Sequence, residues 1–167
     1  MKRNILICFL FLFATALQSS SLKEYSIEKL EKILVKEFHP YPTYGDDIWF
    51  KIPDSIRLVY INQAEMRIHD NWESFPASLF MEYKQTGDRN RYQNVYFKKR
   101  SQLTTLAMGE LLEGKGRFIL PLINGILSTC EETWWGLPAH YGTCLPQPED
   151  QTVALFAAQT AGDLALI

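Results

Sequence analysis

The residue types best suited to binding or acid–base chemistry gather in one stretch, positions 131–141. Its acidic, aromatic and imidazole members are Glu131, Glu132, Trp134, Trp135, His140 and Tyr141. In a cleft, indole rings stack on the apolar C–H faces of sugars, while Glu, His and Tyr side chains donate or accept hydrogen bonds and protons. Two adjacent tryptophans cannot both enter a core from a regular helix, because neighbouring positions point about 100° apart. The stretch therefore indicates either a ligand site or a structural plug with buried indoles and paired N–H groups.

Elsewhere the sequence offers little further chemistry. Residues 88–96 form a second polar and aromatic stretch, read either as part of a site or as the solvated start of a helix. His39, His69 and His140 are isolated from one another, and the sequence contains no nucleophile elbow and no phosphate-binding glycine loop. We therefore expect neither a metal ion nor a cofactor.

Two cysteines flank the aromatic stretch. Cys130 and Cys144 lie fourteen positions apart, and an oxidising compartment permits a disulfide between them. Cys130 also falls on the apolar face of an expected helix, where a buried free thiol is common. From the sequence we favour the buried free thiol.

The elements that position these residues all have the pattern of helices. Apolar residues recur at helical spacing over 26–38, 53–69, 76–85, 90–113 and 119–130, and again after Pro148-Glu149-Asp150, which suits a helix N-terminus. The clearest stripe consists of Ile119, Leu122, Ile123, Ile126, Leu127 and Cys130. No alternating strand pattern of any length is present. The predicted class is all-α, built from antiparallel helical hairpins with short connections.

The last expected helix carries Val153, Phe156 and Thr160 and continues to Ile167. No capping glycine, basic last turn or polar tail closes it. From this pattern we expect the chain to be a truncated part of a larger helical domain.

The first twenty residues predict a secretory signal peptide. Lys2 and Arg3 precede an apolar run from Ile5 to Leu17, and small residues follow. A run of about 13 residues is shorter than the roughly 20 that span a bilayer, which disfavours the alternative of a membrane anchor. We therefore expect a periplasmic or extracellular protein with no stable membrane anchor after the signal is cleaved.

Composition restricts the class of partner. Of 167 residues, 47% are hydrophobic, 13% are aromatic and 22% are charged, and the formal net charge is −2. The high apolar content excludes a disordered chain. The absence of a basic excess argues against nucleic acid as a partner.

Several motifs resemble the heparinase II/III-like family of polysaccharide lyases. They are NRYQNVYFKKR at 90–100, LEGKGRF at 112–118, INGI at 123–126, CEETWWGLPAH at 130–140, LPQPEDQ at 145–151 and LFAAQTA at 155–161. The resemblance covers nearly all of the chain after residue 20. It implies that residues 1–20 are a signal peptide and that residues 21–167 are the N-terminal part of an α/α-toroid, here an incomplete one.

Members of that family cleave uronic-acid polysaccharides such as heparin, heparan sulfate or alginate by β-elimination, and a β-sandwich region follows their toroid. The reaction needs a group that neutralises the C6 carboxylate, a base for the C5 proton and an acid for the leaving oxygen. In the family these groups lie beyond the part that this chain resembles. The resemblance therefore assigns no catalytic residue here and implies that the chain is inactive alone.

The partner that the resemblance implies is an acidic, uronic-acid-containing polysaccharide. The candidate substrate-binding residues are Trp134, Trp135, His140, Tyr141 and Glu132. A non-catalytic carbohydrate-binding helical protein is the main alternative. A toroid hydrolase acting on unsaturated glucuronides ranks last, because it needs paired carboxylates and the adjacent Glu131 and Glu132 point in different directions on a helix.

Overall fold

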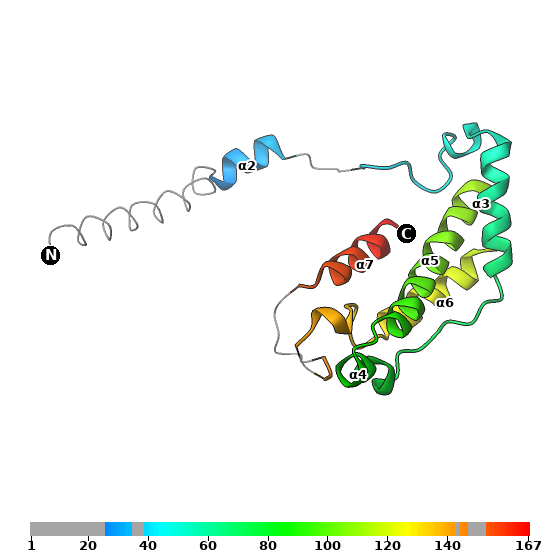
Figure 1. Ribbon diagram of the computed structural model, residues 1–167. Helices are drawn as coiled ribbons and strands as arrows, with labels where there is room; N and C mark the ends of the chain where they lie inside the picture. Colours follow the sequence, from blue (N-terminus) through cyan, green and yellow to red (C-terminus); the bar gives the residue numbers. More distant parts are fainter. Residues whose placement is uncertain (1–25, 35–38, 143, 147–152) are drawn as a thin grey trace, which may run out of the picture. The chain divides into compact units, whose positions relative to one another are not determined.

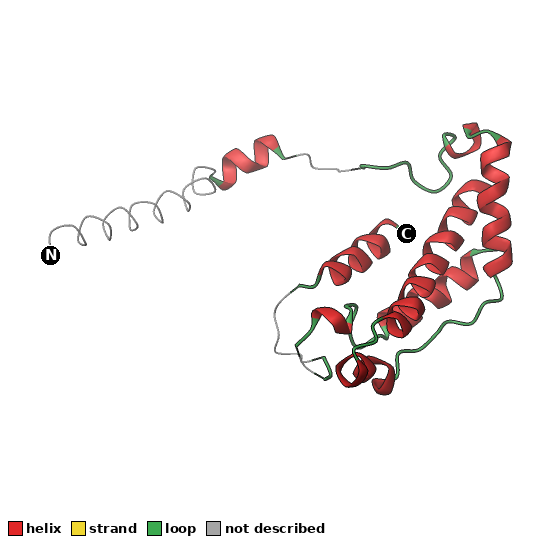
Figure 2. Ribbon diagram, viewed as in Figure 1, coloured by secondary structure: helices red, strands yellow, loops and turns green. Residues whose placement is uncertain are grey.

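The computed structural model describes residues 26–34, 39–142, 144–146 and 153–167. The predicted signal peptide lies outside these residues. The chain divides into two compact units, one up to Tyr41 and one from Pro42 onward. Figure 2 shows only helices and loops in the described part of the chain, which confirms the all-α prediction. No described helix combines the length and apolar character needed to cross a bilayer.

The first unit contains one short described helix, α2 (Ile27–Ile33). Ser26 is its N-cap, and the Ser26 hydroxyl accepts a hydrogen bond of 3.2 Å from the backbone N–H of Lys29. No residue of α2 is buried. The predicted continuation to Phe38 is wrong at Leu34, whose backbone is already extended, and residues 35–38 lie outside the described chain.

The second unit contains five α-helices and two 3₁₀ turns among its described residues (Figure 1). They are η1 (Trp49–Lys51), α3 (Asp54–Arg67), α4 (Ala77–Thr86), α5 (Asn90–Glu113), α6 (Ile119–Cys130), η2 (Pro138–His140) and α7 (Leu155–Leu166). The bounds of α5 agree with the predicted 90–113. Gly87 and Gly114 end α4 and α5 with positive φ angles of 76° and 67°, a backbone conformation that favours glycine. The predicted start of α7 at Pro148 is wrong, because Ala154 is extended and the helix begins at Leu155.

The helix α5 is the centre of this unit. It carries most of the buried side chains, and α3 and α6 both pack against it. The predicted core positions Leu103, Leu106 and Ala107 are buried. Gly109 allows α3 to approach closely, because a Cβ atom there would lie 2.3 Å from the Cβ of Ala64.

The apolar stripes that the sequence marks on α3 and α6 are only partly buried. In α6 only Gly125 and Thr129 are fully buried. Of the predicted stripe, Leu122 and Ile126 are partly buried and Leu122 packs against the core, whereas Ile119, Ile123 and Leu127 are exposed. A Cβ at Gly125 would lie 2.3 Å from the indole of Trp72, so this glycine makes room for the indole on the packed side of α6. A small side chain at the contact, rather than the largest apolar ones, therefore sets the rotation of α6.

In α3, too, several apolar residues are exposed. Its buried residues are Ile61 and Ala64, whereas Ile56, Val59 and Tyr60 are exposed. Both helices that pack on α5 thus present a second apolar face to solvent. Large exposed apolar surfaces are uncommon on complete monomeric domains.

Candidate functional site

The aromatic stretch forms the loop between α6 and η2, and its first tryptophan is held between two rings. Trp134 lies 5.4 Å from Phe80 of α4 and 4.9 Å from Tyr141, measured between ring centroids. Gly136 permits this packing, since a Cβ atom there would lie 2.2 Å from the Trp134 indole. The loop is therefore folded back on itself, with Trp134 and Tyr141 in contact.

A buried group of charges fixes the start of this loop. The Glu132 carboxylate lies 2.8 Å from the ammonium nitrogen of Lys99, and both Nη atoms of Arg100 donate to its two oxygens. The side chains of Lys99, Arg100 and Glu132 are 1%, 9% and 5% exposed. We call these three residues the ionic clamp. Such a bidentate, charge-assisted arrangement is geometrically specific.

The ionic clamp also reaches neighbouring segments. The Lys99 ammonium lies 2.9 Å from the Ser128 hydroxyl, 3.1 Å from the Ser128 carbonyl oxygen and 3.0 Å from the Glu73 carbonyl oxygen. These contacts join α5 to the end of α6 and to the segment that precedes α4. Because two cations meet one carboxylate, the clamp has a net charge of +1, and the carbonyl oxygens help to stabilise it.

A hydroxyl pair connects α7 to the same region of α5. The Tyr96 hydroxyl lies 2.8 Å from the Thr160 hydroxyl, 3.0 Å from the Trp135 carbonyl oxygen and 3.1 Å from the Phe156 carbonyl oxygen. The Arg100 Nε donates to the Thr160 hydroxyl at 3.0 Å. Thr160, which the sequence placed on the last helix, is therefore buried.

Two ionisable groups in this region are electrostatically perturbed. Burial raises the pKa of Tyr92 well above its ordinary value, and the Glu132 charge raises it further. For Arg100, burial is the largest single effect and opposes the charged form, but the hydrogen bonds and charge of Glu132, together with Tyr96, outweigh it and raise the pKa of the guanidinium. Tyr92 thus stays neutral and Arg100 stays charged through the neutral range.

The structure divides the five predicted substrate-binding residues into two groups. Glu132 is buried in the ionic clamp, and Trp135 donates its indole N–H to the Thr129 carbonyl oxygen at 2.8 Å. Trp134 and Tyr141 are partly exposed, and His140 is exposed. The first group holds the loop in position, and the second group supplies its accessible surface. We call Trp134, His140 and Tyr141 the aromatic surface.

The two adjacent acids have different surroundings. Glu131 is exposed, whereas Glu132 lies inside the ionic clamp. They do not form the carboxylate pair that glycoside hydrolysis needs. Among the described residues, no cluster of three His, Cys, Asp or Glu side chains could hold a metal ion.

The predicted buried thiol at Cys130 is wrong. Cys130 and Cys144 are both exposed free cysteines. The reason is the rotation of α6: Thr129 faces the packed interior, and the next position along a helix is turned by about 100°.

Sequence reasoning missed Lys99 and Arg100, although a signal for Lys99 was present. Tyr92, Tyr96, Lys99 and Leu103 follow one another at helical spacing, so Lys99 shares the buried face of α5. A lysine on an apolar stripe requires an acidic partner from another segment. Only the tertiary structure identifies that partner as Glu132.

Replacing Tyr96 by phenylalanine tests the hydroxyl pair. The Thr160 hydroxyl and the Trp135 and Phe156 carbonyl oxygens would lose a hydrogen-bonding partner. We expect the free energy of unfolding to fall by about 1–2 kcal/mol in urea titrations. Replacing Tyr83, a partly buried tyrosine on α4, by phenylalanine is the control and should change stability less. An equal loss in both variants would contradict a special role for the Tyr96 hydroxyl.

Comparison of the sequence with models of known protein families gives no match, and comparison with curated proteins gives none either.

Proposed function

We propose that this chain is the N-terminal helical part of an exported protein resembling heparinase II/III-like polysaccharide lyases, and that it binds an acidic polysaccharide without cleaving it. In this proposal the described hairpins are part of an incomplete α/α-toroid. The protein acts in the periplasm or outside the cell, has no stable membrane anchor after signal cleavage, and does not bind nucleic acid.

The aromatic surface is the observation that carries the proposal. Trp134 and Tyr141 present partly exposed rings in contact with each other. The exposed His140 directly precedes Tyr141 in the chain, and its ring lies 5.6 Å from that of Phe156 of α7. Rings of this kind offer an apolar face and a polar edge, a combination that suits sugars. The ionic clamp holds the loop that carries them, so little conformational entropy is lost when a ligand binds.

The same geometry favours binding without β-elimination. Elimination needs a neutralising group, a base and an acid around one sugar ring. Glu132 is paired with two cations, and the Tyr96 hydroxyl is buried among hydrogen-bonding partners. The aromatic surface itself supplies two groups with suitable chemistry, His140 and Tyr141, where elimination needs three.

Tryptophan fluorescence tests the binding. Titration of the purified chain with heparan sulfate or alginate oligosaccharides should shift the emission of the partly exposed Trp134 in a saturable way. Replacing His140 by alanine should weaken the binding about tenfold or more, the loss expected for one hydrogen bond to a charged group. The matched control replaces the exposed His69 by alanine and should bind normally. An unchanged emission spectrum would refute polysaccharide binding at this surface.

Absorbance of the unsaturated product tests the absence of cleavage. Incubation of the chain with heparin, heparan sulfate and alginate should give no steady increase in absorbance. Sustained turnover would refute the non-catalytic part of the proposal, and it would require a complete set of catalytic groups within these 167 residues.

A further inference from the structure

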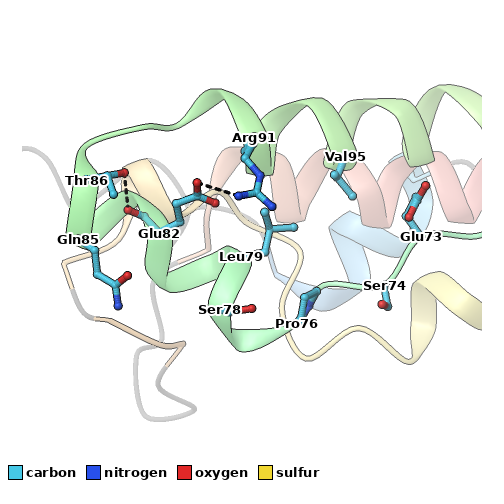
Figure 3. A pocket seen from close by; sticks show the side chains of 10 residues that line it. All are labelled: Glu73, Ser74, Pro76, Ser78, Leu79, Glu82, Gln85, Thr86, Arg91 and Val95. Atoms are coloured by element: carbon cyan, nitrogen blue, oxygen red, sulfur yellow. Dashed lines mark hydrogen bonds and ion pairs between the residues drawn. The ribbon is translucent and has the colours of Figure 1, made fainter.

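A polar depression lies on α4 and α5. Its residues belong neither to the ionic clamp nor to the aromatic surface. It has a volume of about 560 Å³. Figure 3 shows the side chains that line it: Glu73, Ser74, Pro76, Ser78, Leu79, Glu82, Gln85, Thr86, Arg91 and Val95. We call this depression the α4–α5 pocket.

Ion pairs lie along the α4–α5 pocket and connect its walls. Arg91 of α5 donates to Glu82 of α4 at 3.1 Å, and Lys98 of α5 lies 3.5 Å from Glu73 in the segment before α4. The helical spacing of Arg91 and Lys98, seven positions apart, places them on one face of α5. Among the residues that line the pocket, Glu73 and Glu82 are acidic and Arg91 is basic, so the lining has no net positive charge.

The surface between these pairs is apolar. Leu79 and Val95 are partly buried, and Figure 3 shows them from α4 and α5 respectively, with Pro76 near by. Hydroxyl groups of Ser74, Ser78 and Thr86 and the amide of Gln85 complete the lining. The pocket thus combines a small apolar area with carboxylate, guanidinium, amide and hydroxyl groups.

We propose that the α4–α5 pocket binds an uncharged saccharide ring. A pyranose has an apolar C–H face, which fits Leu79, Val95 and Pro76, and it has hydroxyls around its edge. A carboxylate accepts hydrogen bonds from two neighbouring hydroxyls, and a guanidinium donates hydrogen bonds to two neighbouring hydroxyls. The Glu82–Arg91 pair therefore holds the hydroxyl edge of the sugar ring, because a carboxylate and a guanidinium lie together in the pocket wall.

The charge balance selects the ligand. An acidic sugar would gain attraction from Arg91 but would meet the carboxylates of Glu82 and Glu73 at the same site. A neutral sugar meets no such repulsion. The cross-pocket ion pairs are partly exposed, with Arg91 at 72%, so they contribute little to stability and can rearrange around hydroxyl groups at small cost.

This pocket is chemically distinct from the aromatic surface, and the inference does not rest on the proposed function. The two sites are expected to differ in ligand: uronate-containing chains at the aromatic surface and a neutral ring in the pocket. No tryptophan lines the pocket, so its occupation is followed by nuclear magnetic resonance of backbone amides.

The test titrates the isotopically labelled chain with cellobiose. We expect saturable shifts confined to residues 73–98, and weaker or no shifts with sorbitol, which has hydroxyls but no ring face. Judged by the shifts at residues 73–98, sodium glucuronate should bind no more tightly than glucose. Absence of saturable shifts with cellobiose, equal shifts with sorbitol, or tighter binding of glucuronate at these residues would overturn the proposal.

Two variants locate the site. Arg91→Ala should weaken cellobiose binding about tenfold, the loss expected for hydrogen bonds to a charged group. Arg89→Ala removes an exposed cation that does not line the pocket and should leave binding unchanged. Glu82→Gln, which keeps the size of the side chain, should weaken binding by a smaller factor and repeats the test if Arg91→Ala does not fold. Unchanged affinity in a folded Arg91→Ala or Glu82→Gln variant would refute the assignment.

Discussion

Replacing Glu132 by glutamine is expected to lower the free energy of unfolding by about 3 kcal/mol or more, the loss typical of breaking a buried ion pair. The variant leaves Lys99 and Arg100 buried with no carboxylate between them. Glutamine has nearly the same size, so the loss reports charge rather than packing. Urea denaturation followed by circular dichroism measures the change, and near-ultraviolet circular dichroism reports whether the aromatic loop stays fixed.

The matched control is Glu131→Gln, because Glu131 is the adjacent acid and is exposed. It should change stability by less than about 0.5 kcal/mol. A double variant, Lys99→Met with Glu132→Leu, removes an acid and a base together and should lose less than the sum of the single changes. If Glu132→Gln were as stable as the wild type, the ionic clamp would not hold the loop.

Replacing Gly109 by alanine is the second change with a large expected effect. The new Cβ would lie 2.3 Å from the Cβ of Ala64, a group attached directly to the backbone of α3. The helices must therefore separate. We expect the free energy of unfolding to fall by about 2 kcal/mol, although alanine by itself favours a helix over glycine by about 0.5–1 kcal/mol.

Gly162 of α7 provides the matched control for this substitution. A Cβ atom there would meet nothing within 4 Å. Gly162→Ala should therefore stabilise the chain by about 0.5–1 kcal/mol, which is the propensity gain alone. Thermal unfolding of the two variants separates packing from propensity, and a stabilised Gly109→Ala variant would show that α3 does not approach α5 so closely.

Much of the secondary structure could be predicted because its signals are local. Helical spacing and flanking glycines located α5 to the residue, and Gly87 and Gly114 end their helices through their own backbone freedom. The start of α7 was misplaced because Pro148 and two acids suit many helix starts. Whether a segment forms the helix start that its local pattern predicts depends on its tertiary contacts.

The candidate site was only partly predictable for the same reason. The aromatic and acidic residues of 131–141 were visible in the sequence, but their division into loop anchors and accessible surface was not. Glu132 is an anchor because its partner Arg100 comes from α5, far away in the sequence. Trp135 is an anchor through the carbonyl oxygen of Thr129, near the end of the preceding helix α6. A lysine on the apolar stripe of α5 indicated a buried charge without naming its counterion.

By itself, the sequence determined the helical class, the position of most helices and the segment in which aromatic and polar side chains gather. These features depend on spacing along one segment, which a linear pattern records. Only the tertiary structure decided which face of each helix is buried. The close approach at Gly109 and the indole of Trp72 against Gly125 set the rotation of α3 and α6, and several large apolar residues of both helices are exposed. Packing depends on the shapes of two surfaces at once, and a single stripe describes only one of them.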